Sequence, residues 1–249
     1  MFEFVSAPMT GRVYEGAAVV RLGDSSPGGR ARFDALARHL QDISDDDARQ
    51  AGFGAYTWVV RRTAIAVHSF PTYLESLSMR TWCAGFGAAW AERRISMVGG
   101  NGARLEAATL WVHLDAAAAR PTRLPVEFLG VFAPSATVGG VVRKVGSKTV
   151  MPQAPAHAWV AGTPWPLRFA DFDVLEHVNN AVYWAAVEQE LASRRDLRAP
   201  LVAAIEHGDP IERGHGVRWF ATDTVDGFEG WLVGAAGEQF AAVTVSAGG

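Results

Sequence analysis

The segment from Asp171 to Asn180, DFDVLEHVNN, holds the densest group of potentially reactive side chains in the chain. Two aspartates, one histidine and two asparagines lie within these ten residues, directly before an amphipathic run that is typical of a helix. The free N–H groups and the dipole at the start of a helix stabilise an oxygen that gains negative charge. The backbone from Val178 to Asn180 is therefore a candidate oxyanion site.

Asp173 and His177 are the candidate acid–base groups of this segment. An aspartate can take a proton from water or orient it, and histidine titrates near neutral pH, so His177 can carry a proton or donate a hydrogen bond. A purely structural interpretation is also open. In it, Asn179 or Asn180 caps the helix and Asp173 accepts hydrogen bonds from the loop backbone.

The segment belongs to an internal repeat of the chain. The run from Arg21 to Leu36 aligns with the run from Arg168 to Tyr183 at a constant offset of 147 residues. Both runs follow a short apolar stretch, pass through a loop with an acidic residue and enter an amphipathic segment. Apolar residues at three- and four-residue spacing predict one long helix in each half, over 33–43 and 183–191.

Strand-like segments bounded by glycine-rich turns follow each expected helix. They cover 57–67, 77–83, 90–98 and 105–114 in the first half, and 201–205, 217–221, 230–234 and 240–245 in the second. This order predicts an α+β tandem hot-dog fold, in which a curved antiparallel sheet wraps each helix and the two sheets join edge to edge. The expected units are 1–130 and 159–249, with a connector over 131–158. A β-barrel with added helices and two unrelated α+β domains are the alternatives.

Composition limits the classes of function. The chain of 249 residues is 49% hydrophobic and 20% charged with a net charge of −3, which is typical of a soluble globular protein and gives no overall basic field for nucleic acid or anionic membranes. The single cysteine, Cys83, excludes an intramolecular disulfide and reads as a small buried hydrophobe. No signal peptide or membrane span is evident, so we expect a cytoplasmic protein. The histidines lack metal-ligand spacing, and no metal is expected.

The string DFDVLEHVNNAVYW resembles the aspartate–histidine–Asn-Asn signature of hot-dog thioesterases. The whole chain resembles the acyl-acyl carrier protein thioesterases, through GRARFDALARHLQD, WVVRRT, TWCAGFGAAWAERR and LWVHLDAAAARPTRLP in the first half, and the likeness spans most of residues 12 to 245. The resemblance implies hydrolysis of a fatty acyl thioester of acyl carrier protein, which ends chain elongation and releases free fatty acid without a metal or organic cofactor. It also implies that the second unit carries the catalytic residues and that the first shapes the acyl pocket.

Carried over residue by residue, the resemblance predicts a catalytic set of Asp173, His177 and Asn179, with Val178 and Asn180 at the oxyanion site. Plant members of the family have an asparagine two residues after the aspartate. Here that position is a leucine, Leu175, which has no hydrogen-bonding side chain.

A further family glutamate aligns near Pro210, with Glu206 and Glu212 as neighbours, so the plant-type set is incomplete. This departure keeps two rival functions open, an acyl-CoA thioesterase and a non-hydrolytic acyl-thioester binding protein. Glu188, at the offset of 147 from Gln41, is expected to be a buried polar anchor on the second helix.

The expected partner, acyl carrier protein, is generally acidic, so docking would need cations near the pocket mouth. The candidates are Arg61, Arg62, Arg93, Arg94, Arg143, Lys144 and Lys148, although such pairs are also typical of an ordinary solvated face. Because tandem units already pair with each other, a monomer or a homodimer is expected.

Overall fold

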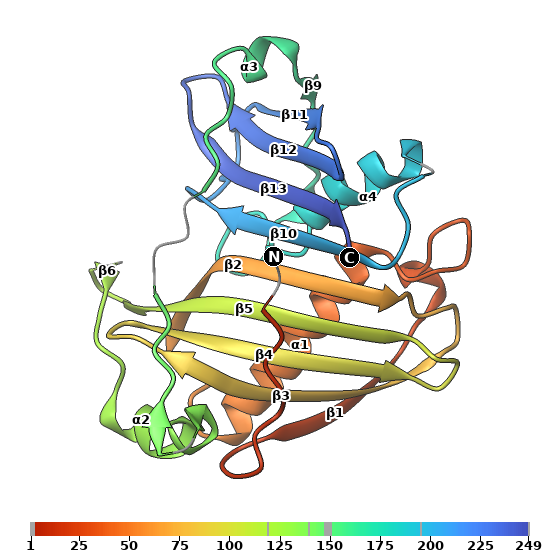
Figure 1. Ribbon diagram of the computed structural model, residues 1–249. Coiled ribbons are helices and arrows are strands. Elements are labelled where there is room, and N and C mark those ends of the chain that lie inside the picture. The colour runs from red at the N-terminus through yellow and green to blue at the C-terminus, as the bar shows by residue number, and fades with distance from the viewer. Residues whose placement is uncertain (1–2, 119, 139, 147–150, 195, 249) are drawn as a thin grey trace.

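The computed structural model describes residues 3–118, 120–138, 140–146, 151–194 and 196–248. Its main feature is one long antiparallel sheet, seen in Figure 1. The strands of the first unit are β1 (Tyr14–Val19), β2 (Thr57–Ser69), β3 (Ser76–Phe86), β4 (Trp90–Gly99), β5 (Arg104–Asp115) and the short β6 (Arg120–Pro121). Those of the second are β9 (Thr163–Pro164), β10 (Leu201–His207), β11 (Val217–Asp223), β12 (Gly227–Gly234) and β13 (Gln239–Ala247).

The strand order of the sheet is symmetric about its centre. Its strand order is β1-β3-β4-β5-β2-β10-β13-β12-β11-β9, so the second half repeats the first in reverse. The two halves meet where β2 pairs with β10, from Leu201 opposite Val67 to Glu206 opposite Arg62. This pairing removes one exposed edge from each unit. The predicted tandem hot-dog fold is confirmed.

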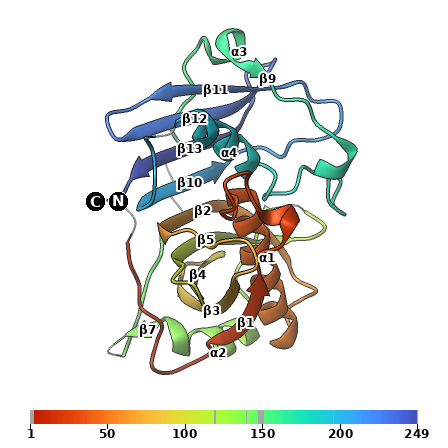
Figure 2. The ribbon, with the colours of Figure 1, turned by 90° about the vertical axis from the view of Figure 1, so that its right-hand side faces the viewer.

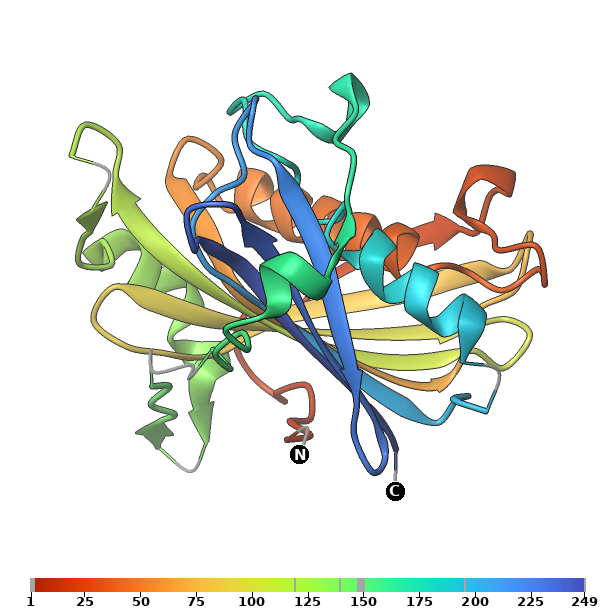
Figure 3. The same cartoon turned by 90° about the horizontal axis from the view of Figure 1, so that it is seen from above.

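Two helices, α1 (Phe33–Gln50) and α4 (Trp184–Ser193), lie side by side on the same face of the sheet and pack against each other (Figure 3). The sheet of the first unit curves around α1, as Figure 2 shows. Apolar residues at helical spacing, including Leu36, Leu40 and Ile43, are buried between α1 and that sheet. The rings of Phe33 and Trp184 stack at 5.4 Å and join the two helices. Among the described residues, no helix is long and apolar enough to cross a membrane.

A short 3-10 turn precedes each helix and confirms the repeat at the offset of 147. The turns are η1 (Leu22–Asp24) and η3 (Phe169–Asp171). In the first, the carboxylate of Asp24 accepts the backbone N–H of Arg21 at 2.9 Å, and in the second Asp171 does the same for Arg168 at 2.7 Å. Each aspartate thus fixes the chain just before its loop turns toward the helix.

The repeat is less regular before the second turn, because the apolar stretch there, from Trp159 to Phe169, overlaps the single-turn helix α3 (Ala158–Ala161) and the two-residue β9. The expected connector over 131–158 has secondary structure of its own. It begins inside helix α2 (Val126–Phe132), continues through η2 (Pro134–Ala136) and the hairpin β7 (Thr137–Val138) and β8 (Val141–Val142), and folds back on the first unit.

Candidate active site

The loop between η3 and α4 is held by backbone hydrogen bonds at both ends. The amide of Asp173 donates to the carbonyl of His177 at 2.9 Å, which closes a tight turn. At the top of this turn Glu176 has a φ of 61°, in the left-handed region. The amide of Val178 donates to the carbonyl of Ile211 at 2.9 Å and ties the loop to the segment between β10 and β11.

Asp173 is half-buried and its carboxylate faces the start of the following turn. One oxygen accepts the backbone N–H of Leu175 at 2.9 Å, and the other lies 3.5 Å from the side-chain nitrogen of Asn179. Leu175 is 62% exposed. Its backbone N–H binds Asp173, while its side chain lies in solvent. One free lone pair on each carboxylate oxygen is left for water.

His177 lies across the same turn from Asp173, but the two side chains are not hydrogen-bonded within the described residues. The imidazole is 42% exposed, and its Nε2 lies 4.0 Å from a carboxylate oxygen of Glu212. His177 and Glu212 also form an isolated antiparallel bridge. Of the two glutamates that flank Pro210 in sequence, Glu212 therefore approaches the candidate site, whereas Glu206 pairs with Arg62 at 3.1 Å.

The start of the second helix differs from the expectation. The residues after Asn179 form a 3-10 turn, with Val182 donating to Asn179 and Ala185 to Val182, and α4 begins only at Trp184. The side chain of Asn179 accepts the backbone N–H of Ala181 at 2.9 Å and so stabilises this turn, but it does not cap α4, whose N-cap residue is Tyr183.

The expected oxyanion role of Val178 is wrong in this geometry. Its amide is already bonded to Ile211, and the amide of Asn179 donates to the carbonyl of Asp171 at 2.9 Å. Within the described part of the chain, the backbone N–H of Asn180 makes no hydrogen bond, so this amide is the one of the three that is left for an oxygen of a ligand.

A cavity of about 390 Å³ runs from Asn179 and Asn180 into the first unit. Aromatic side chains form much of its wall and floor, namely Phe53, Tyr56, Trp58, Trp111, Phe128 and Phe132. Polar side chains also line it, among them Gln41, Asp42, Asp45, Glu92 and Arg93. A pocket of this size, with an aromatic part and polar groups beside it, suits a small organic ligand. Neither Asp173 nor His177 lines the cavity, and Asp173 adjoins it through Asn179.

Helix α2 closes the cavity and was missed in the sequence. Phe128 and Phe132 pack on Phe53 at ring distances of 5.5 and 5.7 Å. The run VEFLGVF places these two phenylalanines four residues apart, which is a weak helical signal that could have been read. Arg93 and Arg12 both bind the buried Asp47 and lie over the Phe132 ring, so a buried ion pair supports the floor.

Cys83 lines the cavity without being a nucleophile. Burial raises the pKa of its thiol to about 11, so very little thiolate forms near neutral pH. Four tryptophans lie on strands of the first unit: Trp58 and Trp111 line the cavity, Trp82 is fully buried, and Trp90 donates to the carbonyl of Val145 at 2.6 Å.

Three of the seven expected docking cations are paired with carboxylates of the first unit, and Arg62 pairs with Glu206 of the second. Arg93 pairs with Asp47, Arg94 with Glu92 at 2.8 Å, and Arg143 with Glu92 at 2.7 Å. Arg61 is exposed on β2, and Lys148 lies outside the described residues. No group of three or more histidine, cysteine, aspartate or glutamate side chains in the described ranges is arranged to hold a metal.

The fold and the cavity define a double hot-dog protein. Residues 11–132 match the acyl-ACP thioesterase N-terminal domain, and residues 160–237 match the acyl-ACP thioesterase C-terminal domain. The chain therefore belongs to the acyl-ACP thioesterase family.

Similar proteins agree with this membership. An uncharacterized protein of Mycobacterium tuberculosis is 29% identical over 84% of this chain and 82% of the relative. The palmitoyl-acyl carrier protein thioesterase of Gossypium hirsutum is 25% identical, over 61% of this chain and 41% of the plant protein. Among solved structures, an acyl-ACP thioesterase from Bacteroides thetaiotaomicron has a TM-score of 0.77 at 16% identity, covering 94% of this chain and 97% of the other. The 12:0-ACP thioesterase from Umbellularia californica has a TM-score of 0.71 at 19% identity, covering 96% and 98%.

Proposed function

We propose that the protein hydrolyses fatty acyl thioesters of acyl carrier protein, with the acyl chain in the cavity of the first unit and the thioester at Asn179 and Asn180. The supporting observation is the position of the cavity, which ends at these two asparagines, one of which lies 3.5 Å from the carboxylate of Asp173. An apolar chain is stabilised by burial against the aromatic wall.

The reaction needs one water. Its oxygen attacks the thioester carbon while Asp173 takes a proton, and the carbonyl electron pair moves onto the carbonyl oxygen, which the Asn180 amide faces. When that pair returns, the C–S bond breaks, and the sulfur takes a proton to leave as a free thiol. We assign the supply of that proton to His177, whose Nε2 lies 4.0 Å from a carboxylate oxygen of Glu212. The products are a free fatty acid and the carrier thiol.

The test is the release of free thiol from C8 to C18 acyl groups carried on acyl carrier protein and on CoA. The wild type should turn over, and Asp173→Asn should lower kcat by about 10² to 10⁴ because the general base is lost. Asp209→Asn is the matched control, since Asp209 is an exposed aspartate on the neighbouring loop. Equal rates for wild type and Asp173→Asn would remove Asp173 from the mechanism. A wild type that binds acyl thioesters without turnover would establish the binding protein instead.

An acyl-CoA thioesterase is the second candidate, because the internal pairing of Arg93, Arg94 and Arg143 removes three of the cations expected to dock an acidic carrier protein. If acyl carrier protein is the substrate, docking to the remaining exposed cations should make kcat/KM fall steeply with ionic strength. A flat salt response together with equal rates on CoA would identify the small carrier.

A further inference from the structure

The first unit contains a second copy of the candidate site loop, matched bond by bond at the offset of 147. Ser26 donates to the carbonyl of Arg30 at 2.8 Å, as Asp173 does to His177. Arg32 donates to the carbonyl of Asp24 at 2.9 Å, as Asn179 does to Asp171 at 2.9 Å.

The remaining bonds of the two loops agree as well. Ala31 donates to the carbonyl of Pro71 at 2.7 Å, as Val178 does to Ile211 at 2.9 Å. At the top of the turn, Gly29 has a φ of 83° where Glu176 has 61°. The two loops therefore share one backbone geometry, and their side chains occupy equivalent positions.

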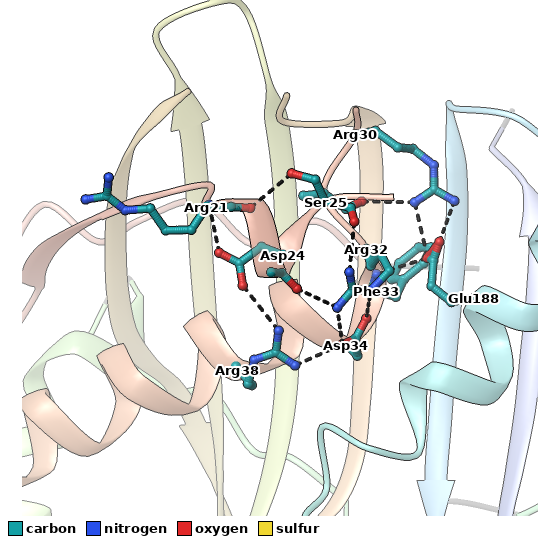
Figure 4. Close-up of polar contacts among 11 residues, drawn as sticks. Arg21, Asp24, Ser25, Arg30, Arg32, Phe33, Asp34, Arg38 and Glu188 are labelled. Atoms are coloured by element: carbon teal, nitrogen blue, oxygen red, sulfur yellow. Dashed lines mark hydrogen bonds and ion pairs between the residues drawn. The ribbon is translucent and has the colours of Figure 1, made fainter. Parts of the chain in front are cut away.

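In the first copy, a carboxylate accepts a hydrogen bond from the backbone N–H at the start of helix α1. Figure 4 shows Glu188, which extends from α4 of the other unit to the beginning of α1. One of its oxygens accepts the backbone N–H of Phe33 at 3.1 Å, and both oxygens accept from Arg30, at 2.6 and 3.1 Å. The Glu188 side chain is only 10% exposed. This copy is therefore closed by a residue from the opposite helix, as the expected anchoring role of Glu188 requires.

The second copy has the same backbone geometry with different side chains, and no side chain that the structure describes is bonded to the equivalent backbone N–H. At the offset of 147, Asn180 takes the position of Phe33, His177 that of Arg30, and Gln41 on α1 that of Glu188. Gln41 and Asn180 line the same cavity. Within the described residues, neither the side-chain amide of Gln41 nor the backbone N–H of Asn180 has a hydrogen-bond partner, whereas their counterparts are bonded to each other.

We propose that Gln41 is a further catalytic residue, contributed by the first unit to the site of the second. The side-chain N–H of Gln41 and the backbone N–H of Asn180 together bind the carbonyl oxygen of the thioester, in the place that a Glu188 oxygen holds in the closed copy. This inference rests on the proposed function. The hydrogen bond from Phe33 to Glu188 shows that the equivalent backbone N–H donates to a negatively charged oxygen in this loop geometry.

A neutral amide at position 41 fits this role better than a carboxylate. When water adds to the thioester carbon, negative charge develops on the carbonyl oxygen, and two N–H donors stabilise it more than they stabilise the ground state. A glutamate would instead accept the Asn180 N–H itself and repel the developing charge, and the site would close as the first copy has closed.

The test compares kcat and KM of the wild type with those of Gln41→Met, which keeps the length of the side chain and removes the donor. Loss of one oxyanion donor should lower kcat by about 10²-fold with a smaller change in KM. Gln41→Glu should lower kcat at least as far. Glu188→Gln, the matched change in the closed copy, should lower Tm because it weakens the pair with Arg30, and should leave kcat unchanged.

A second measurement tests the geometry without turnover. The double variant Gln41→Glu with His177→Arg recreates the arginine–glutamate pair of the closed copy, so its Tm should exceed the value expected from adding the two single variants. Unchanged kcat in Gln41→Met, an effect confined to KM, or additive Tm values in the double variant would each overturn the inference. A wild type that hydrolyses no acyl thioester would overturn the proposed function instead. The Tm comparison of the single and double variants would then still test whether the two loops share one geometry.

Discussion

Replacement of His207 by phenylalanine should make the protein more resistant to acid. His207 ends β10, directly before the loop that holds Val178, and its ring lies edge-on to Tyr183 at 4.9 Å. Neither ring nitrogen has a hydrogen-bond partner within the described residues. Burial, with a smaller contribution from the charge of Arg61, lowers the pKa of His207 to about 3.

The sign of the effect follows from proton binding in the two states. The unfolded chain takes up a proton at this histidine near pH 6.5, whereas the folded chain does so only near its folded pKa of about 3. The stability is therefore complete above pH 6.5 and is lost progressively as the pH falls toward 3. The loss is about 1.4 kcal/mol per pH unit, or about 2 kcal/mol between pH 6.5 and pH 5, which corresponds to about 4 to 8 °C in Tm for a chain of this size.

The assay is thermal and urea unfolding of wild type and His207→Phe at pH 8, 7, 6 and 5, followed by circular dichroism. Phenylalanine keeps the ring packed on Tyr183 and cannot bind a proton, so the difference in unfolding free energy should shift by about 2 kcal/mol in favour of the variant at pH 5. His68→Gln, which removes an exposed imidazole, is the control. Parallel pH curves for wild type and His207→Phe would refute the argument from burial.

Three further predictions concern the cavity and the repeated loop. Iodoacetamide should leave the folded protein unmodified at pH 8, and Cys83→Ala should retain kcat, because burial raises the pKa of the thiol to about 11. Phe132→Ala should cost about 3 to 5 kcal/mol in urea unfolding and shift preference in the acyl panel toward longer chains, since this buried ring closes the cavity floor. Gly29→Ala should lower stability by about 1 kcal/mol because φ is 83° there, whereas Glu176→Gly at the equivalent position should not; equal effects would contradict a shared loop geometry.

Much of the fold could be predicted from the sequence because the apolar pattern of each strand is local information. The expected strands over 57–67 and 105–114 lie within β2 and β5, and the offset of 147 correctly pairs Asp24 with Asp171. The second unit was harder to predict, since its first apolar stretch is interrupted by α3 and β9 has only two residues. In such short elements tertiary packing outweighs local preference.

The candidate site was harder to predict than the fold, because its properties depend on partners distant in sequence. The sequence makes Val178 a reasonable oxyanion donor, but in the structure its backbone N–H donates to the carbonyl of Ile211. Arg143 was a reasonable docking cation until Glu3 and Glu92 were found beside it. Local spacing shows which groups a segment carries, and it does not show which of them remain free.

Three side-chain differences between the two copies account for one copy being closed and the other open. Asp173 replaces Ser26, His177 replaces Arg30, and Gln41 replaces Glu188. In the closed copy, the ion pair between Arg30 and Glu188 joins the two units and occupies the helix-start amide, so it contributes to stability and leaves no room for a substrate oxygen. Among the described residues of the open copy, the same frame leaves the Asn180 amide free at the cavity, with the Asp173 carboxylate beside Asn179 and the His177 imidazole near Glu212. Fusion of two units in one chain allows this division, because each copy can then change without changing the other, which a dimer of identical subunits cannot do.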